Sequence, residues 1–380
     1  MIYLDNNATT RLAPEVREAM LPFLDSAFGN PSSSHAAGLE ARKALEAARG
    51  SVATLLGANS SEIVFTSGGT ESDNWAIRGA LDADPDKRHI VTTRVEHEAV
   101  RKLCEKLELD GFEVSWLDVD GQGSLDLDQL RDSLRRETAV VSVMLANNET
   151  GILFPVDEIA EIVKTRSGAL VHVDGVNAAG KIPVDLRNSG IDLFSISAHK
   201  FHGPKGIGAL YVRDGVQLPR FFVGGGQESG RRAGTEAVHQ IVGLGAAAEF
   251  VRDMSDIERV RRLRDKLERE ILQNIPIASL NGTSHETRRL PNTSNISFEN
   301  LNGEAIMARL DDAGICVSTG SACNANDHVP SQILMAMDVP YSKAMGSIRF
   351  SLGRFNTDGE VAKVVDEMQK IVEELSRLAA

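Results

Sequence analysis

The 380-residue sequence predicts an α/β protein with a large domain, built on a mostly parallel seven-stranded sheet, and a smaller α+β domain. Two observations predict this class. Between residues 62 and 213, seven short runs rich in β-branched residues alternate with amphipathic helical patterns, which is typical of βαβ units. After a Gly-rich stretch at 224–236 and a long helical pattern at 237–274, a second series of shorter helices and strands follows.

The large domain is expected to span residues 15–258. Its predicted strands are Glu62–Ser67, His89–Arg94, Phe112–Leu117, Ala139–Ala146, Ala169–Asp174, Asp192–Ser197 and Gly208–Arg213. Most are separated by the predicted helices Gly38–Leu56, Glu98–Leu109, Asp126–Arg136 and Val156–Thr165. Because ligands bind outside the carboxyl ends of parallel strands, we expect functional residues directly after these runs.

The small domain is expected to combine residues 1–14 with residues 259–380. Its predicted elements are strands at Asn292–Phe298, Gly314–Ser318 and Ser347–Leu352, a helix at Glu304–Ala313 and a closing helix from Asp358. We expect the Gly-rich stretch and the helical pattern after it to connect the two domains.

Composition excludes several classes of protein. Hydrophobic residues make up 42% and charged residues 25%, which argues against collagen-like and wholly disordered chains. The net charge of −13 gives no attraction to a phosphate backbone, so we expect no nucleic-acid partner. No apolar run reaches the ~18 residues of a membrane span, and the start lacks a signal-peptide pattern, so we expect a cytoplasmic protein without a membrane partner.

Three cysteines in 380 residues argue against a disulfide framework and for a reducing compartment. Cys104 and Cys316 lie in apolar patterns and are predicted to be small packing residues. Cys323 follows a predicted strand in the polar stretch STGSAC, where a thiol can be deprotonated and reach a ligand. Neither Cys-x-x-Cys spacing nor clustered histidines occur, so no metal site is predicted.

An anion cradle is one interpretation of SGGTES (67–72). Gly68 and Gly69 permit a tight turn after a strand, and Thr70 opens a helix whose first amide groups attract a phosphate. Simple capping of the helix by Thr70 explains the pattern equally well.

Asp174 and Lys200 follow two of the predicted strands. A carboxylate and a lysine at neighbouring strand ends suit pyridoxal phosphate (PLP), since the lysine forms the Schiff base and the carboxylate keeps the pyridine nitrogen protonated. A buried ion pair or a solvated lysine is the alternative. Lys205, in Gly-Pro-Lys-Gly, is better interpreted as part of a turn.

Three further polar residues follow strands or lie on them. His97 could stack on a planar cofactor and handle protons, or cap a helix. Asn147 could donate to a ligand oxygen, or build a turn. Arg349 could hold a substrate carboxylate through two hydrogen bonds, or lie on the surface of a strand.

Taken together and in this order, the motifs resemble the cysteine desulfurases, PLP enzymes of fold type I, the fold of aspartate aminotransferase. The resemblance runs nearly end to end. It includes LDNNATT (4–10), FGNPSSSH (28–35), SGGTESDN (67–74), VEH (95–97), ANNETG (146–151), SISAHK (195–200), GGGQESGRRAGTE (224–236), STGSAC (318–323) and RFSLG (349–353). The residues after Cys323 are similar to those of the branch that has the longer active-site cysteine loop.

The resemblance implies a role for each motif residue. Lys200 would be the Schiff-base lysine, Asp174 the partner of the pyridine nitrogen, and His97 the stacking and catalytic imidazole. Asn147 would bind the phenolic oxygen together with Asn177, which departs from the usual Gln and is shorter. Gly69, Thr70, Ser197 and His199 would bind the phosphate, with Thr235 reaching it from the partner subunit of a homodimer. Arg349, helped by Asn147, would bind the substrate carboxylate.

The implied activity is the conversion of L-cysteine to L-alanine, with a persulfide forming on Cys323 for transfer to an acceptor such as an iron–sulfur scaffold or a thiolation protein. The Cys323 thiol must then lose its proton, and His97 is a candidate acceptor. Two alternatives stay open. One is a selenocysteine lyase or another aminotransferase-like PLP enzyme, and the other is a non-catalytic sulfur-assembly partner.

Overall fold

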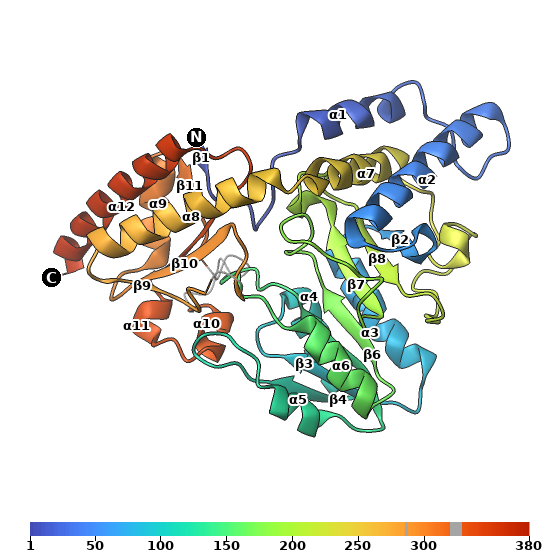
Figure 1. Ribbon diagram of the computed structural model, residues 1–380, viewed down its shortest axis with the longest axis horizontal. Coiled ribbons are helices and arrows are strands. Elements are labelled where there is room, and N and C mark those ends of the chain that lie inside the picture. The colour runs from blue at the N-terminus through green and yellow to red at the C-terminus, as the bar shows by residue number, and fades with distance from the viewer. Residues whose placement is uncertain (286–287, 320–328, 380) are drawn as a thin grey trace.

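The computed structural model describes residues 1–285, 288–319 and 329–379 (Figure 1). Seven strands form one sheet in the order β2-β8-β7-β6-β5-β3-β4. They are β2 (Ile63–Thr66), β3 (His89–Thr93), β4 (Glu113–Leu117), β5 (Thr138–Met144), β6 (Leu170–Asp174), β7 (Leu193–Ser197) and β8 (Gly208–Val212). Every neighbouring pair is parallel except those of β8, which runs antiparallel to β2 and β7. The predicted mostly parallel seven-stranded sheet is confirmed.

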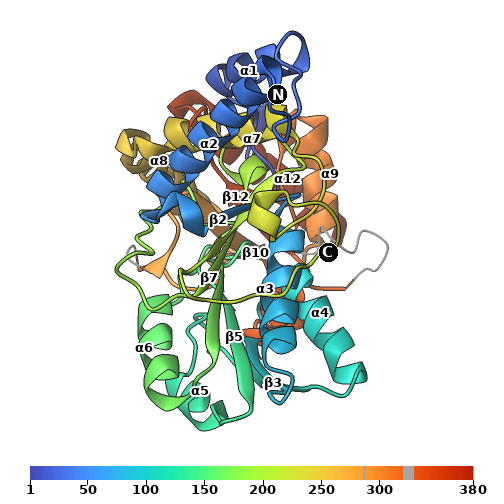
Figure 2. The same cartoon turned by 90° about the vertical axis from the view of Figure 1, so that its right-hand side faces the viewer.

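Helices cover both faces of this sheet, as Figure 2 shows with α3 and α4 on one side and α5 and α6 on the other. The helices of this part of the chain are α1 (Pro14–Met20), α2 (Ala36–Leu56), α3 (Gly69–Ala83), α4 (Glu98–Leu109), α5 (Leu127–Ser133), α6 (Val156–Arg166) and α7 (Val238–Arg252). Short 3-10 turns lie at Leu21–Leu24, Ser60–Glu62, Ala198–Lys200 and Glu228–Gly230. Strands such as β5 and β7 are buried along their whole length, which explains their continuous apolar sequence.

The predicted helical pattern at 237–274 is two helices, α7 and α8 (Ser255–Asn274). Asp253 leaves the helical region, with φ −74° and ψ 106°, and its side chain accepts a hydrogen bond from Ser255 N. The two helices bury their apolar residues in different cores: Leu244 of α7 packs with the large sheet, whereas Leu267 of α8 packs with the second sheet. A change of partner therefore accounts for the break.

The second sheet has the antiparallel order β12-β10-β9 and lies under α8, α9 and α12 (Figure 1). Its elements are β9 (Ala278–Leu280), β10 (Thr293–Phe298), α9 (Gly303–Asp312), β12 (Ser347–Ser351) and α12 (Asp358–Ala379). The first residues of the chain join this part, because β1 (Ile2–Tyr3) pairs in parallel with β11 (Ile315–Cys316). The strand predicted at 314–318 is thus only two residues long. Cys316 is half-buried, so the prediction of a buried packing thiol is wrong there, whereas Cys104 is fully buried.

Two short helices, α10 (Gln332–Ala336) and α11 (Tyr341–Ala344), return to the large sheet. Ile333 and Leu334 belong to its hydrophobic core, not to that of the second sheet. The segment before α10 is thereby brought to the edge of the large sheet.

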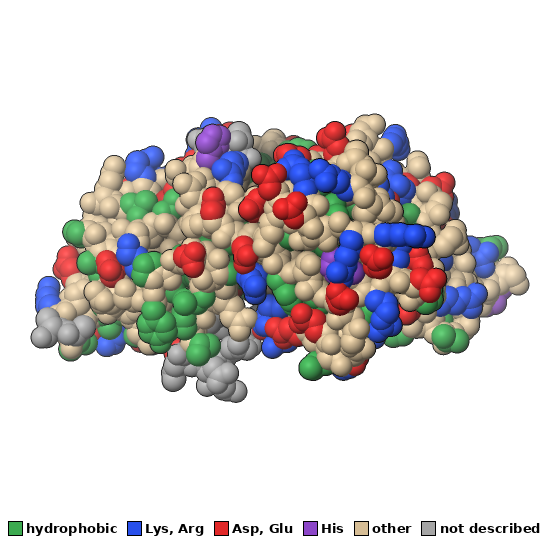
Figure 3. Space-filling model, turned by 90° about the horizontal axis from the view of Figure 1, so that it is seen from below, with side chains coloured by type: hydrophobic (Ala, Val, Ile, Leu, Met, Phe, Trp, Pro, Cys, Tyr) green, Lys and Arg blue, Asp and Glu red, His purple; other side chains and the backbone are tan. Residues whose placement is uncertain are grey.

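The surface mixes charges of both signs. Figure 3 shows acidic and basic side chains interspersed over the face that is turned down in Figure 1. Within the described ranges, none of the helices combines the length and the apolar character needed to cross a bilayer.

Candidate active site

A cavity of about 460 Å³ lies where the carboxyl ends of the central strands meet the second sheet. The large-sheet side contributes strand ends and the start of α3, and the other side contributes β12 and residues 329–333. Among the residues that line it are Gly69, Thr70, His97, Asp174, Asn177, Ser197, His199, Lys200 and Arg349. Nine of the predicted site residues, far apart in the sequence, therefore come together at one place.

Asp174 ends β6 and is buried. Its Oδ1 accepts a hydrogen bond from Val176 N at 2.9 Å. Burial and the nearby Asp73 carboxyl together raise the pKa of the Asp174 carboxyl to about 6, against an opposing effect of His97. A cationic partner in the cavity would keep this carboxyl ionised, because opposite charge favours the charged form.

His97 lines the cavity and also caps α4, so the capping interpretation is confirmed and the stacking role stays a prediction. Its Nδ1 accepts a hydrogen bond from Ala99 N at 3.1 Å. Burial and the charge of Lys200 lower the pKa of the imidazole, against an opposing effect of Asp174. Since Nδ1 is an acceptor, the neutral ring carries its proton on Nε2 and presents a donor rather than a proton acceptor.

Lys200 follows β7 and is half-buried. Its Nζ donates a hydrogen bond to Asn7 O at 2.5 Å. The side-chain Oδ1 of Asn7 also accepts a hydrogen bond from Lys181 Nζ, at 3.0 Å. Burial holds the pKa of the Lys181 amine well below its usual range, and Lys200 and Arg349 lower it further. The opening segment of the chain thus orients the amine of Lys200.

The turn before α3 closes one end of the cavity. Gly68 has φ 150° and ψ −175°, a conformation open only to glycine, and it lets the helix begin at Gly69 directly after the strand. Thr70 is exposed toward the cavity, beside Ser197 and His199. Burial lowers the pKa of His199 to about 4, so the ring is neutral, and its Nδ1 lies 3.2 Å from Thr9 Oγ1. Helix amides and a hydroxyl suit an anion at this end.

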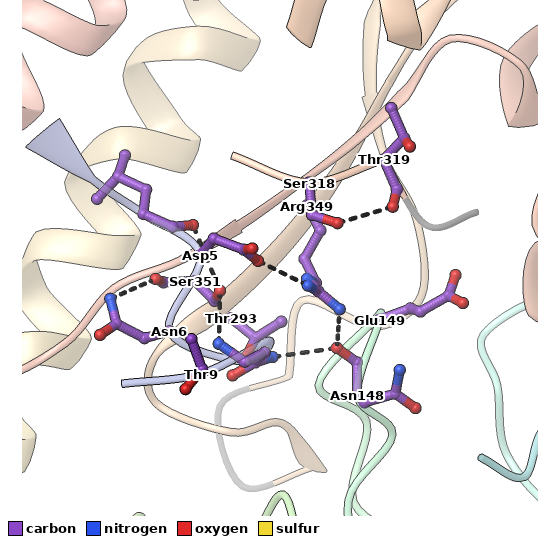
Figure 4. A network of polar contacts seen from close by, with 12 residues as sticks. Asp5, Asn6, Thr9, Asn148, Glu149, Thr293, Ser318, Thr319, Arg349 and Ser351 are labelled. Atoms are coloured by element: carbon purple, nitrogen blue, oxygen red, sulfur yellow. Dashed lines mark hydrogen bonds and ion pairs between the residues drawn. The ribbon is translucent and has the colours of Figure 1, made fainter. Parts of the chain in front are cut away.

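Arg349, in β12, is buried and held from two sides (Figure 4). Its Nη2 pairs with Asp5 Oδ1 at 2.7 Å, and its Nη1 donates to Asn148 O at 3.0 Å. Its Nε has no hydrogen-bond partner among the described residues. The guanidinium therefore has a fixed orientation and a donor left for a ligand in the cavity.

Asn147 and Asn177 use their amides inside the protein. Asn147 Oδ1 accepts from Glu149 N and Thr150 N, and its Nδ2 donates to Val95 O. It builds the turn, and Asn148 lines the cavity in its place. Asn177 accepts from Lys181 at 2.7 Å and donates to Asn147 O at 3.3 Å. Contacts of either amide with a ligand stay predictions.

Besides Asn147, two predicted residues are not placed at the cavity. Thr235 is exposed in the segment between β8 and α7 and does not line it in this single chain. Cys323 lies outside the described residues. Of the flanks of its segment, residues 329–333 line the cavity, and Ser318 pairs with Arg349, which is itself a lining residue.

Besides the partly exposed Glu98, three acidic residues of the cavity were missed by the sequence prediction: Asp73, Glu96 and Glu149. All three are buried. Burial raises the pKa of Asp73 and of Glu149 to about 7 and that of Glu96 well above its usual range. Each stands within a motif that was singled out for a neighbour, which is the only signal that the sequence offers.

The donor set fits PLP. Lys200 supplies an amine for the aldehyde, and Asp174 supplies a buried carboxyl that lines the cavity. The α3 terminus with Ser197 suits the phosphate, and the His97 ring offers a flat face. Arg349 stays available for the carboxylate of an amino acid.

Comparison with known proteins gives the family. The aminotransferase class-V model matches residues 2–364. A cysteine desulfurase of Trichormus azollae is 54% identical over 381 residues, which cover 100% of this chain and 94% of the relative. The cysteine desulfurase NifS of Azotobacter vinelandii is 49% identical, with the same coverage of 100% and 94%.

Solved structures agree. A NifS-like protein superposes with a TM-score of 0.92 at 39% identity, covering 98% of this chain and 100% of that protein. SspA in complex with cysteine gives a TM-score of 0.83 at 34% identity, covering 94% and 100%. Because these likenesses extend over nearly the whole chain, the protein belongs to the aminotransferase class-V family and, within it, to the PLP-dependent cysteine desulfurases.

Proposed function

We propose that this cysteine desulfurase converts L-cysteine to L-alanine and collects the sulfur as a persulfide on Cys323. The observation that carries the proposal is the meeting of the Lys200 amine, the Asp174 carboxyl and the Arg349 guanidinium in one cavity. These groups suit, in turn, the cofactor aldehyde, its ring nitrogen and the substrate carboxylate. The role of the thiol is supported by residues 329–333, which line the same cavity, and by Ser318, which pairs with Arg349.

The residues divide the work as follows. When bound, PLP supplies an electron sink for the bonds at the substrate Cα. Asp5 and Asn148 hold the Arg349 guanidinium in place, and Arg349 orients the substrate by binding its carboxylate. Once the substrate amine has replaced the Lys200 amine, Lys200 would take the proton from the substrate Cα. His97 keeps its proton on Nε2, so we assign it hydrogen-bond donation and stacking rather than deprotonation of the thiol.

Sulfur transfer balances without an added oxidant. The Cys323 thiolate attacks the substrate sulfur, and an S–S bond forms while the Cβ–S bond breaks. The electron pair of that bond stays with carbon, which takes up a proton, so the products are L-alanine and the Cys323 persulfide.

The partners are also proposals. The exposure of Thr235 supports a role at a neighbouring subunit's site, hence a homodimer. A persulfide needs a protein acceptor, for which an iron–sulfur scaffold or a thiolation protein is suitable. Such a thiol requires a reducing compartment, which we take to be the cytoplasm.

The Cys323→Ser variant tests the proposal. We expect sulfide release from L-cysteine, measured with excess dithiothreitol, to fall by about 100-fold because the sulfur acceptor is lost, while the absorbance of the bound cofactor stays. Mass spectrometry of the wild type after L-cysteine addition should show one added sulfur on the Cys323 peptide. Cys316→Ser is the matched control and should keep full activity.

The same samples separate the alternatives. Full sulfide release by Cys323→Ser would refute the assignment. Selenocysteine lyase activity persisting in that variant would favour the lyase, and keto-acid-dependent turnover would favour an aminotransferase. A colourless wild type, with no absorbance to lose in Lys200→Ala, would indicate the non-catalytic partner.

A further inference from the structure

Glu149 is a buried acid of the cavity to which the proposed reaction gives no role. It lies in the turn 147–151 that follows β5, 7% exposed, and lines the cavity beside Asn148. Figure 4 shows its side chain extending away from the Arg349 guanidinium. A buried carboxyl in this position needs a partner, because desolvation of the group is costly.

That partner is Ser331. Its Oγ donates a hydrogen bond to Glu149 Oε2 at 2.5 Å. The same Oγ accepts from Ile333 N and Leu334 N, and so caps α10. Ser331 is itself only 4% exposed. The hydroxyl thus joins the carboxyl of Glu149 to the start of α10.

Residues 329–333 face the cavity that Arg349 also lines, and we call them the facing wall. At one end of this wall, Ile333 packs in the hydrophobic core of the large sheet. On the side of the cavity, Glu149 holds the wall through its hydrogen bond with Ser331.

The turn also holds Arg349. Asn148 O accepts from Arg349 Nη1 at 3.0 Å and from Asn7 Nδ2 at 3.1 Å. The backbone carbonyl of the next residue, Glu149, accepts a hydrogen bond from Asn295 Nδ2 of β10. Two consecutive residues of one turn therefore hold the carboxylate-binding arginine and the facing wall.

We propose that Glu149 is a positioning residue that, through Ser331, sets the spacing between Arg349 and the facing wall, so that the cavity fits a small α-amino acid held by its carboxylate. This inference rests on the proposed function, since it takes Arg349 as the carboxylate site. It adds a determinant of substrate size outside the groups that touch the cofactor.

The charge of Glu149 is consistent with this role. Burial raises the pKa of its carboxyl to about 7, with Ser331 and Arg349 acting in the opposite direction. What the facing wall requires is an acceptor oxygen at this place, and glutamine supplies one. Glu149→Gln should therefore retain the spacing, whereas Glu149→Ala and Ser331→Ala should lose it.

Steady-state kinetics and a binding titration test the proposal on the PLP-loaded protein. For Glu149→Ala and for Ser331→Ala we expect the KM for L-cysteine to rise about tenfold, with kcat changed by less than about threefold, because one buried hydrogen bond is lost. Glu149→Gln should stay within about threefold of the wild-type KM. The double variant should be no worse than Ser331→Ala, since that single change already removes the bond to Glu149 together with the cap of α10.

Two controls match the chemistry elsewhere. Ser294→Ala removes a buried bond from a serine hydroxyl to Glu268, at 2.7 Å. Asp126→Ala removes the N-terminal cap of α5. Both should leave the KM for L-cysteine unchanged, which separates the proposed effect from a general loss of stability.

Three results would overturn the proposal: additive effects in the double variant, a glutamine variant as impaired as the alanine variant, or an unchanged KM in Ser331→Ala. If Glu149→Ala fails to fold, Ser331→Ala and Glu149→Gln still decide. Titration with the product L-alanine, followed by cofactor absorbance, gives the affinity without any sulfur chemistry. A wild type that binds L-alanine but releases no sulfur would refute the proposed function alone, and one that does not respond to L-alanine would refute the inference.

Discussion

Beneath the active site, a polar row crosses the interior of the large sheet. His172, two residues before Asp174 in β6, lies between Ser142 Oγ at 2.8 Å and Ser195 Oγ at 3.0 Å. Asp73 of α3 approaches the same ring, with Oδ1 3.5 Å from Nε2. Burial lowers the pKa of His172 to about 4 and raises that of Asp73 to about 7, so the two are a neutral pair rather than an ion pair.

Asp73 gives a test of this arrangement through pH. Its carboxyl binds a proton up to about pH 7 in the folded chain but only to its ordinary pKa of 3.8 when unfolded. The folded state therefore holds more protons in this window, and wild-type stability falls as pH rises through it. Asp73→Asn removes that dependence. Its free energy of unfolding relative to wild type should rise on the order of 2 kcal/mol from pH 5 to pH 8.

Urea denaturation at the two pH values measures the effect. Asp82→Asn, on the exposed face of the same helix, is the control and should show the same difference from wild type at both. An Asp73→Asn variant whose relative stability does not change with pH would mean that Asp73 is ionised in the folded protein.

The sequence was sufficient to predict which residues lie at the strand ends. It did not show which of their neighbours also line the cavity. Asp174, Lys200 and His97 follow apolar runs, so the topology of a parallel sheet places them at one edge. Glu96 and Glu149 stand beside such residues in turns, where no periodicity tells which side chain points inward. Only the folded turn shows that Asn147 turns its amide inward and Glu149 lines the cavity.

The ends of strands β6 and β7 pack closely against each other. Gly175 directly follows Asp174, and its amide donates to Ser195 O at 3.0 Å. A Cβ at this position would lie 1.9 Å from Phe194 Cζ in β7. The aromatic ring therefore occupies the space that a side chain would need, and it fixes the end of β6 against β7.

Gly175→Ala should consequently destabilise the fold by about 2 kcal/mol or more, because a buried ring must move. Since Asp174 moves with it, the affinity for PLP should also fall. Chemical denaturation and cofactor titration measure the two effects. Gly359→Ala, in α12 with nothing near its Cβ, is the control and should be neutral or stabilising; equal behaviour of the two variants would contradict the packing argument.

Elements with strong hydrophobic patterns were predictable. Six strands of the large sheet lie within the predicted runs, β5 begins one residue before its run, and α4 has the predicted bounds. The division of residues 237–274 was not predictable, because both halves have helical periodicity. What differs is the core that each half meets, and that depends on tertiary structure. The pairing of β1 with β11 was missed for the same reason, since two-residue strands have no pattern.

At the scale of the whole molecule, the proposed homodimer predicts complementation. If Thr235 serves the partner's site, a heterodimer of Lys200→Ala and Thr235→Ala protomers combines one intact site with one site that carries both changes. We expect half the wild-type activity per dimer and wild-type PLP affinity at the active site, because the working lysine receives its threonine from the other protomer.

Differently tagged protomers, purified as the heterodimer, allow the measurement at limiting PLP. The Thr235→Ala homodimer is the reference for weakened cofactor binding. A heterodimer whose active site shows that same weakening would mean that Thr235 acts within its own chain, and a sedimentation profile of monomers would rule out the dimer.

The opening segment has a consequence for biosynthesis. Asp5 pairs with Arg349 and Asn7 N binds Ser351 Oγ, contacts that span 344 residues of sequence. A ribosome makes residues 5–7 long before residues 349–351, so this segment waits, without its partners, until Arg349 and Ser351 have emerged. The sheet of βαβ units can form earlier, but the orientation of Lys200 and Arg349 is completed later. Competence to receive substrate is therefore gained only after residue 351 has been translated.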